Sequence, residues 1–238
     1  SGFNISPTIY IDEYYQDLKK GLAFSDVFSN ILGTYYNYRP VENIDPAFFK
    51  DFRNISHRVA FKLIHYQRNV ELLKEIPHIP FLDLAMVFYC LVTSTNHANA
   101  TILITQEHLR LWETCTDKLY ALARENTPRL MDSHLEQTAF SVLSPTPMYI
   151  LSNKCRYFGA ACLLYDRLLS KLSHNLSADF FIIPSSIHEV LLVPASSNMN
   201  KEDFNRMIQE VNNSTLRPEE ILSDHVYYYS SSDDKILM

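Results

Sequence analysis

Apolar residues recur at helical spacing near the start of the chain. Asp12 is placed to cap a helix that follows a short predicted strand over residues 5–11. A second predicted helix begins at Phe24 and ends before Pro40, because the residue preceding a proline disfavours helical backbone. Its broad apolar stripe comprises Phe24, Val27, Phe28, Ile31, Leu32 and Tyr35. This stripe must be buried against a partner, for which we expect a sheet, and we assign residues 1–56 to an N-terminal segment of strand and helices.

From residue 57 the pattern changes from a helical period to an alternating one. Apolar and more polar side chains alternate over residues 58–65, which predicts a half-buried strand. The elements expected next are a helix near 69–76, a hairpin of strands 82–92 and 101–104, a helix from Thr105 to Trp112, and a helix from Thr116 that ends before Pro128. Together they form a strand-helix-strand-strand-helix unit over residues 57–129.

The second half of the chain repeats this order. The expected elements are a strand over 157–164, a helix capped by Asp166, strands over 179–183 and 189–193, a helix capped by Asn200, a strand over 226–229 and a fraying tail over 230–234. We therefore predict an α+β fold of two tandem strand-helix-strand-strand-helix units with mixed or antiparallel sheets flanked by helices. Residues 130–155 are the expected linker, and residues 156–238 form the second unit with a C-terminal strand. A crevice between the units would be a natural ligand site, with chance similarity as the alternative to a true repeat.

The composition is that of a globular protein without a membrane span. The chain has 238 residues, of which 47% are hydrophobic and 20% charged, and its 4 glycines exclude Gly-rich low-complexity structure. The densest apolar run, residues 81–92, contains Asp83 and is shorter than the ~20 residues of a membrane helix. A net charge of −6 makes nucleic acid an unfavourable partner. The four cysteines form no CxxC pair, which fits reduced thiols and predicts a cytoplasmic protein.

Motifs for cofactors and metals are missing from the sequence. There is no glycine-rich phosphate loop, so neither a Rossmann nor a P-loop nucleotide site is expected. The nine histidines lack the H-x-x-x-H and H-E-x-x-H spacings of metal sites, so we expect no metal and no cofactor. His65, at the end of its predicted strand, is expected to be a core or rim histidine with one hydrogen bond.

The most suggestive segment for catalysis is the predicted hairpin tip at residues 183–190. A hydrolase would use Ser185 or Ser186 as the nucleophile, His188 as the base and an acid elsewhere as the orienting group. In an extended segment, however, Glu189 points away from the face shared by Ser186 and His188, and the sequence has no G-x-S-x-G motif. The favoured interpretation is that Pro-Ser-Ser forms the turn and that His188 and Glu189 tether it.

Three further residues are candidates for ligand binding. Asp224 and His225 precede a segment with three tyrosines, so they could form an acid-base pair beside an aromatic platform. We favour the alternative, in which Asp224 is a turn residue before an edge strand. Arg129 and Arg217 follow the last helices of the two units. They could bind an anionic ligand symmetrically, or pair instead with nearby carbonyls or a carboxylate.

Two segments carry a family resemblance. Residues 184–190, Pro-Ser-Ser-Ile-His-Glu-Val, and residues 222–229, Leu-Ser-Asp-His-Val-Tyr-Tyr-Tyr, resemble the signature segments of an uncharacterised bacterial family, a domain of unknown function common in anaerobic gut bacteria. The resemblance extends over nearly the whole chain. It implies a bacterial, intracellular protein in which a further helical segment precedes this sequence, and it supplies no activity, cofactor or catalytic residue.

Three classes of function remain open. The leading hypothesis is a non-enzymatic binding or regulatory module whose site lies between the two units and whose partner is an unknown small molecule or protein. The second is a hydrolase-like enzyme at the Ser-Ser-x-His hairpin, which requires an acid or oxyanion donors within about 3 Å of one hydroxyl. The third is a mobile-element or phage-related interaction protein, which would expose an apolar patch of several hundred Å².

Overall fold

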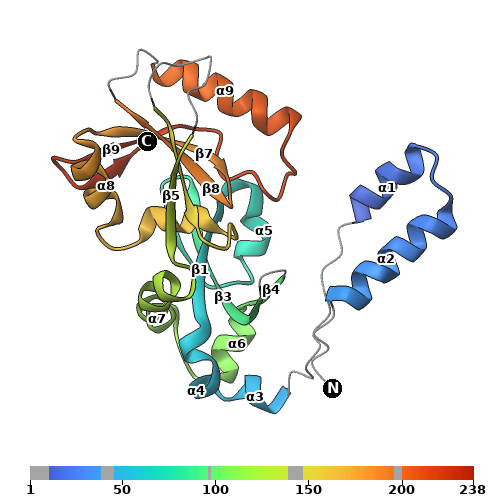
Figure 1. The fold of residues 1–238 in the computed structure, drawn as a ribbon. Helices are drawn as coiled ribbons and strands as arrows, with labels where there is room; N and C mark the ends of the chain where they lie inside the picture. The colour runs from blue at the N-terminus through green and yellow to red at the C-terminus, as the bar shows by residue number, and fades with distance from the viewer. Residues whose placement is uncertain (1–10, 39–45, 96–97, 139–146, 196–199) are drawn as a thin grey trace.

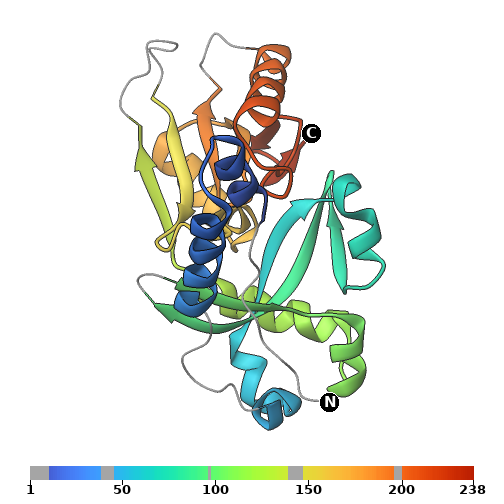
Figure 2. The same cartoon turned by 90° about the vertical axis from the view of Figure 1, so that its right-hand side faces the viewer.

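The computed structural model describes residues 11–38, 46–95, 98–138, 147–195 and 200–238. Figures 1 and 2 show two sheets with helices around them and a helical hairpin, α1–α2, standing to one side. All strand pairs in both sheets are antiparallel, which confirms the α+β class with antiparallel sheets. The strand predicted over 5–11 lies outside the described residues except for Ile11, which opens a helix.

The helices range from single turns to long segments. They are α1 (Ile11–Lys19), α2 (Phe24–Tyr38), α3 (Pro46–Lys50), α4 (Phe52–Ile55), α5 (Val70–Leu73), α6 (Gln106–Leu111), α7 (Thr116–Leu130), α8 (Leu168–Leu176) and α9 (Lys201–Ser214), with 3-10 turns η1 (Ser56–Arg58), η2 (Gln67–Asn69) and η3 (Gly159–Leu164). The cap predicted at Asn200 is confirmed, because its side chain accepts from a backbone amide of α9, and Thr105 caps α6 in the same way. The cap predicted at Asp166 is wrong, because α8 follows Arg167 and its N-terminus has no side-chain cap. α7 continues through Pro128, so the prediction that it ends before this proline is wrong. The proline removes one backbone hydrogen bond in the last turn only.

The first sheet has β3 at its centre. Its strands are β1 (Val59–His65), β2 (His78–Phe81), β3 (Leu84–Thr95) and β4 (Ala98–Leu103). β1 pairs with one edge of β3, while β2 and β4 pair with successive parts of the other edge. The predicted hairpin of strands over 82–92 and 101–104 is confirmed. β2 was not predicted because Pro80 disfavours a strand interior, but an edge strand tolerates it.

β1 is buried on both faces, so the prediction of a half-buried strand is wrong. Every residue of β1 except Lys62 is buried. α7 lies along the free edge of the strand, where the Asn126 amide donates to the Val59 carbonyl at 3.0 Å. The Thr127 hydroxyl accepts from the Phe61 amide at 3.1 Å. These two side chains satisfy backbone groups that a sheet edge would otherwise leave unpaired.

The second sheet has the strand order β10-β9-β7-β8-β6-β5. Its strands are β5 (Ser133–Gln137), β6 (Tyr149–Asn153), β7 (Phe180–Ser186), β8 (Glu189–Pro194), β9 (Tyr227–Ser230) and β10 (Lys235–Leu237). The prediction of a fraying tail over 230–234 is wrong, because this segment turns back and pairs β10 with β9. The Tyr229 hydroxyl donates to Asp234 and holds the turn. Residues 130–155, expected as a linker, contain β5 and β6.

Residues 159–164 form a 3-10 helix, so the strand predicted over 157–164 is wrong. η3 packs on β6 and β8 of the second sheet and on β1 of the first. A Cβ atom added at Gly159 would collide with Ser152 Oγ and with the His188 carbonyl oxygen. Close backbone packing therefore explains the run of small residues Gly-Ala-Ala. It also means that the second unit lacks the opening strand of the first.

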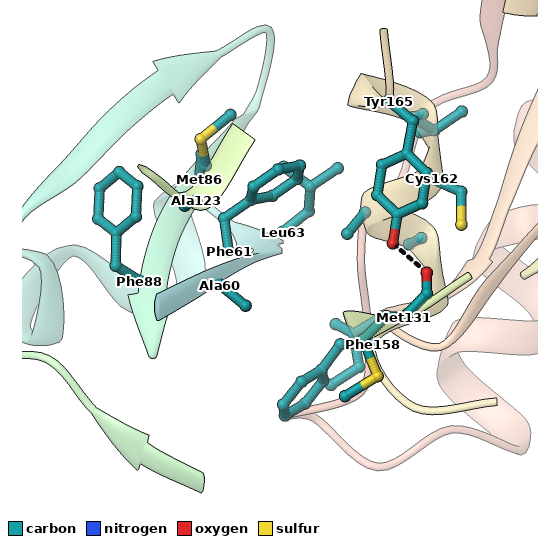
Figure 3. Close-up of a cluster of buried hydrophobic side chains, with 14 of the residues drawn as sticks. Ala60, Phe61, Leu63, Met86, Phe88, Ala123, Met131, Phe158, Cys162 and Tyr165 are labelled. Carbon is teal, nitrogen blue, oxygen red and sulfur yellow. Dashed lines mark hydrogen bonds between the residues drawn. The ribbon is translucent and has the colours of Figure 1, made fainter. Parts of the chain in front are cut away.

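The largest apolar cluster among the described residues joins the two sheets, and two smaller clusters lie beside it. Its buried side chains come from strands of both sheets and from α7 and η3. In Figure 3, Phe61 and Leu63 of β1 lie opposite Tyr165 and Cys162. The rings of Phe61 and Tyr165 meet edge-on with 6.3 Å between centroids. The Tyr165 hydroxyl donates to the Met131 carbonyl at 2.7 Å, so this buried phenol is satisfied.

Among the described residues, α2 packs mainly on α1, whereas the sequence leads to the expectation of a sheet as its partner. Val27 is buried, whereas Phe24, Phe28 and Leu32 of the same predicted stripe are exposed. The stripe is wider than the face that one short neighbouring helix covers. The hairpin stands apart from the sheets in Figure 1 and lies in front of them in Figure 2.

Candidate functional site

Two clusters of side chains lie where residues 57–129 meet residues 156–238, the two parts of the chain that are called the two units below. The aromatic–lysine cluster consists of Lys62, Tyr89, Tyr157, Phe158 and His188. The latch cluster consists of His65, Arg68, Asp83, Asn212, Ser223, Asp224 and Tyr227. Each cluster draws residues from both halves of the chain, so each depends on the tertiary fold and not on one local motif.

Phe158 is the centre of the aromatic–lysine cluster. Lys62 Nζ lies 4.0 Å from the centroid of its ring, within range of a cation–π interaction. The Tyr89 ring meets Phe158 at 5.4 Å and 64°, the His188 ring stacks on it at 5.8 Å and 9°, and the Tyr157 centroid lies 3.9 Å away. Lys62 is a partly buried cation beside these rings. Within the described part of the chain it has no carboxylate ion pair.

The backbone that presents Phe158 adopts left-handed conformations. Arg156 and Phe158 have φ values of 49° and 56°, which bulky residues rarely adopt. The Asn153 side chain donates to the Tyr157 carbonyl at 2.7 Å and accepts from the Tyr157 amide at 3.2 Å. The Phe158 amide donates to His188 Nδ1 at 3.2 Å. Strained residues held in place by their surroundings cluster at functional sites, which makes this loop a candidate on geometry alone.

Burial lowers the pKa of two basic groups in this cluster. The pKa of Lys62 falls from 10.5 to about 8, because removal from solvent penalises the ammonium form. Burial also lowers the pKa of His188; Lys62 acts in the same direction, whereas Glu220 and Glu189 oppose it. A desolvated cation gains most from an anion that replaces the lost solvent. The cluster therefore favours an anionic group beside Lys62.

The hairpin candidates are engaged in turn and interface contacts. Ser186 Oγ accepts from the His188 backbone amide at 3.0 Å, while the His188 ring accepts from the Phe158 amide through Nδ1. Neither of these is the nucleophile–base hydrogen bond that catalysis needs. The interpretation that Pro-Ser-Ser forms the turn is wrong, because β7 continues through Ser186 and the turn consists of Ile187 and His188. Glu189 lies 4.0 Å from Arg156, and Ser185 is half-buried in β7.

In the latch cluster, Asp83 connects the first unit to the second. It occupies the two-residue turn between β2 and β3, after Leu82, whose φ is 54°. Its carboxylate accepts hydrogen bonds from the Tyr227 and Ser223 hydroxyls, each at 2.6 Å. Burial, together with the adjoining carboxylate, raises the pKa of Tyr227. Hydrogen bonds to an ionised acceptor are roughly twice as strong as neutral ones, so this contact is a major tie between the units.

Asp224 makes the second set of latch contacts. Its carboxylate accepts from Arg68 at 3.2 Å and from Asn212 at 2.8 Å, and lies 3.6 Å from His65 Nε2. Burial opposes ionisation of Asp224, but the donors Asn212 and Arg68 outweigh it and lower its pKa. His65 is buried, and its Nδ1 accepts from the Arg68 amide at 3.4 Å. The candidate ligand-binding residue Asp224 is thus engaged between the units.

The remaining sequence candidates lie outside both clusters. Arg129 donates to the Glu125 carbonyl at 3.2 Å and to Asn126 Oδ1 at 2.7 Å, which matches the alternative of pairing within its own helix. Arg217 follows α9 and is half-buried. Across the described ranges, no group of three or more His, Cys, Asp or Glu side chains is placed to hold a metal ion. A search of the same ranges found no helix with the length and apolar character of a membrane span.

Most residues of the two clusters are not candidates from the sequence, among them Lys62, Asp83 and Phe158. Lys62 is the one lysine in β1, a strand whose other residues are all buried. A lysine at this position indicates a functional site only when the strand is known to be buried on both faces. Asp83 is a lone carboxylate within an apolar run. Phe158 has no signal beyond the neighbouring Gly159, where a close backbone approach excludes a side chain.

The fold and its two clusters define an α+β protein with a polar and aromatic junction between two antiparallel sheets. A model of DUF5688, a family of unknown function, matches residues 1–231, and the chain belongs to this family. Searches of curated proteins and of solved structures found no match. Both segments that carried the resemblance contribute to the junction, since 184–190 contains His188 and 222–229 contains Ser223, Asp224 and Tyr227. A bacterial source remains a prediction.

Proposed function

We propose that this protein is a non-enzymatic binding module that holds a small organic acid at the aromatic–lysine cluster. The observation that carries the proposal is the partly buried ammonium of Lys62, which lies 4.0 Å from the Phe158 ring centroid and has no carboxylate ion pair among the described residues. A carboxylate or phosphate would supply the missing counter-charge. A planar body attached to it would pack on the half-buried rings of Tyr157 and His188 at the edge of the cluster.

The bonding of the hairpin supports binding over hydrolysis. The Ser186 hydroxyl accepts from the His188 backbone, and the imidazole is oriented by the Phe158 amide. Both interactions fix the ring that stacks on Phe158 instead of activating a nucleophile. The latch contacts of Asp83 and Asp224 hold the two units against each other, which keeps the cluster preorganised for a ligand.

Proton linkage follows from the chemistry of Lys62. In the free protein its pKa is about 8. An anionic ligand stabilises the ammonium form and raises that pKa, so binding takes up protons near and above pH 8. The affinity is therefore constant at lower pH and falls as the pH rises above about 8, by up to roughly tenfold per pH unit.

Ligand-observed NMR with simple probes tests the proposal on the full chain. The probes are benzoate and phenyl phosphate, with benzyl alcohol as the uncharged control. We expect the two acids to bind with a Kd of about 1 mM or below and the alcohol to bind at least about tenfold more weakly. The Lys62→Met variant should lose this difference. Lys118→Met is the matched control, because Lys118 also lies over a phenylalanine ring, 5.2 Å from the Phe52 centroid, but on an exposed surface.

Two results would contradict the proposal. One is equal binding of the acids and the alcohol in the wild-type protein. The other is acid binding that persists unchanged in Lys62→Met. Absence of binding by either acid at about 10 mM would also reject an organic acid as the ligand class.

A further inference from the structure

α2 presents an exposed apolar row that no part of the described structure covers. Phe24, Phe28 and Leu32 follow one another at intervals of four residues, so they lie on one face of the helix. Their exposed fractions are 71%, 49% and 38%. The rings of Phe24 and Phe28 stack at 6.1 Å and 14°, which extends the row as a continuous ridge. Val27, by contrast, is buried.

A row of small residues runs beside this ridge. Ser25, Ser29 and Gly33 each follow a ridge residue by one position and therefore form the adjacent groove. A Cβ atom added at Gly33 would meet no heavy atom within 4 Å, so the groove is open at that end. Because α2 carries a single charged residue, Asp26, burying this surface would remove little charge from water and would cost little free energy of desolvation.

We propose that α2 packs antiparallel against α2 of a second copy of this chain. A twofold axis between Phe28 and Ser29 would place Phe28 opposite Ser29 of the other copy. The same axis would place Phe24 opposite Gly33 and Leu32 opposite Ser25. Every large side chain of the ridge then faces a small side chain of the groove, and symmetry repeats each contact twice. This self-complementary register is the reason for choosing a second copy over an unrelated protein.

The exposed area is that of a weak, reversible pair. Five exposed apolar residues belong to the hairpin, namely Tyr15, Leu22, Phe24, Phe28 and Leu32. At about 200 Å² for a fully exposed side chain of this size, they present roughly 500 Å² per copy. The three ridge residues account for roughly 300 Å² of this area, so two copies would bury about 600 Å² along the ridge, which is the size of a weak, reversible contact. The largest apolar patches of monomeric proteins are of similar or smaller size and are often functional.

Sedimentation velocity on the full chain, from about 1 to 200 µM, tests the proposal over the affinity range expected for a small interface. We expect a mass of about twice the 27.7 kDa of one chain at the upper concentrations. Phe28→Ser removes the central ridge residue, and Gly33→Phe fills the groove opposite Phe24; each should shift the protein to monomer. The double variant Phe24→Gly/Gly33→Phe exchanges the large and small members of one pair and should restore the dimer. Phe48→Ser, at an exposed phenylalanine of α3, is the control that should leave the mass unchanged.

Thermal melts of each variant separate loss of pairing from loss of folding, because the hairpin stands apart from the two sheets. A wild-type protein that stays monomeric at the highest concentration would overturn the proposal. A dimer that persists in both Phe28→Ser and Gly33→Phe would assign the interface elsewhere and overturn it as well. Failure of the folded double variant to pair would reject the antiparallel register.

Discussion

The Tyr227 hydroxyl donates a 2.6 Å hydrogen bond to Asp83 across 144 positions of sequence. Asp83 lies in a turn of the first sheet and Tyr227 at the start of β9 in the second. The contact therefore joins two distant segments of the chain through a charge-assisted hydrogen bond from a buried phenol. Removal of this hydrogen bond should therefore destabilise both units.

Tyr227→Phe should lower the free energy of unfolding by about 1.5–3 kcal/mol, since it removes a hydrogen bond to an ionised acceptor. Urea denaturation at neutral pH measures the change. Tyr228→Phe is the matched control: its hydroxyl donates to Asp179 at 2.9 Å, and its side chain is less buried. We expect a loss below about 1 kcal/mol there. Equal losses in the two variants would show that the Asp83 contact is not a special tie.

Gly159→Ala should destabilise the fold by about 1–3 kcal/mol or more, because the new methyl group would collide with Ser152 Oγ and the His188 carbonyl. Gly33→Ala provides a contrast. It adds the same methyl group in open space inside a helix and should raise stability by about 0.5–1 kcal/mol. Thermal and urea denaturation at low protein concentration report both values. A neutral Gly159→Ala would argue against the close approach of η3 to the hairpin.

Lys62→Met should stabilise the protein at pH 7 by about 1–2 kcal/mol, after allowance for the solvent that still reaches the ammonium. The folded-state pKa of Lys62 is about 8, below its ordinary 10.5. Between about pH 8 and pH 10.5, Lys62 is protonated in the unfolded chain but not in the folded chain. The free energy of unfolding of the wild-type protein therefore increases as the pH rises through this range. The advantage of the variant should therefore shrink from pH 7 to about pH 10. An advantage that is independent of pH would contradict the burial of a charged Lys62.

The four cysteines should divide into two reactive and two protected thiols. Cys115 and Cys155 are exposed, whereas Cys90 and Cys162 are buried. Burial raises the pKa of each buried thiol to about 12, which suppresses the thiolate that reacts. A thiol-specific disulfide reagent should modify Cys115 and Cys155 in the native protein and all four in urea. Rapid native modification of Cys162 would mean that η3 opens readily.

Local patterns predicted the elements that are formed by local rules. The caps at Thr105 and Asn200 are visible in sequence because a side-chain acceptor at that position satisfies free amides of the first turn. The β7–β8 hairpin follows from two apolar runs around a polar turn. The sequence predicts a strand where the 3-10 helix at Gly159 lies, since the small residues of this helix are explained only by the strands packed around it.

The candidate site was only partly accessible from sequence for the same reason. The residue types of His188 and Asp224 make both of them candidates from the sequence, and both lie at the junction. Lys62 and Asp83 acquire their meaning from partners more than ninety positions away, Phe158 in one case and Tyr227 in the other. No periodicity or motif encodes such a pairing.

The shared core has a consequence for how this family can diverge. Phe61 from the first half of the chain and Tyr165 from the second meet ring to ring inside the same apolar cluster. A chimaera that combines one half of this protein with the other half of a distant relative would bring together surfaces that were shaped separately. Substitutions on the two sides must therefore compensate each other, and the halves are expected to evolve as one inseparable unit.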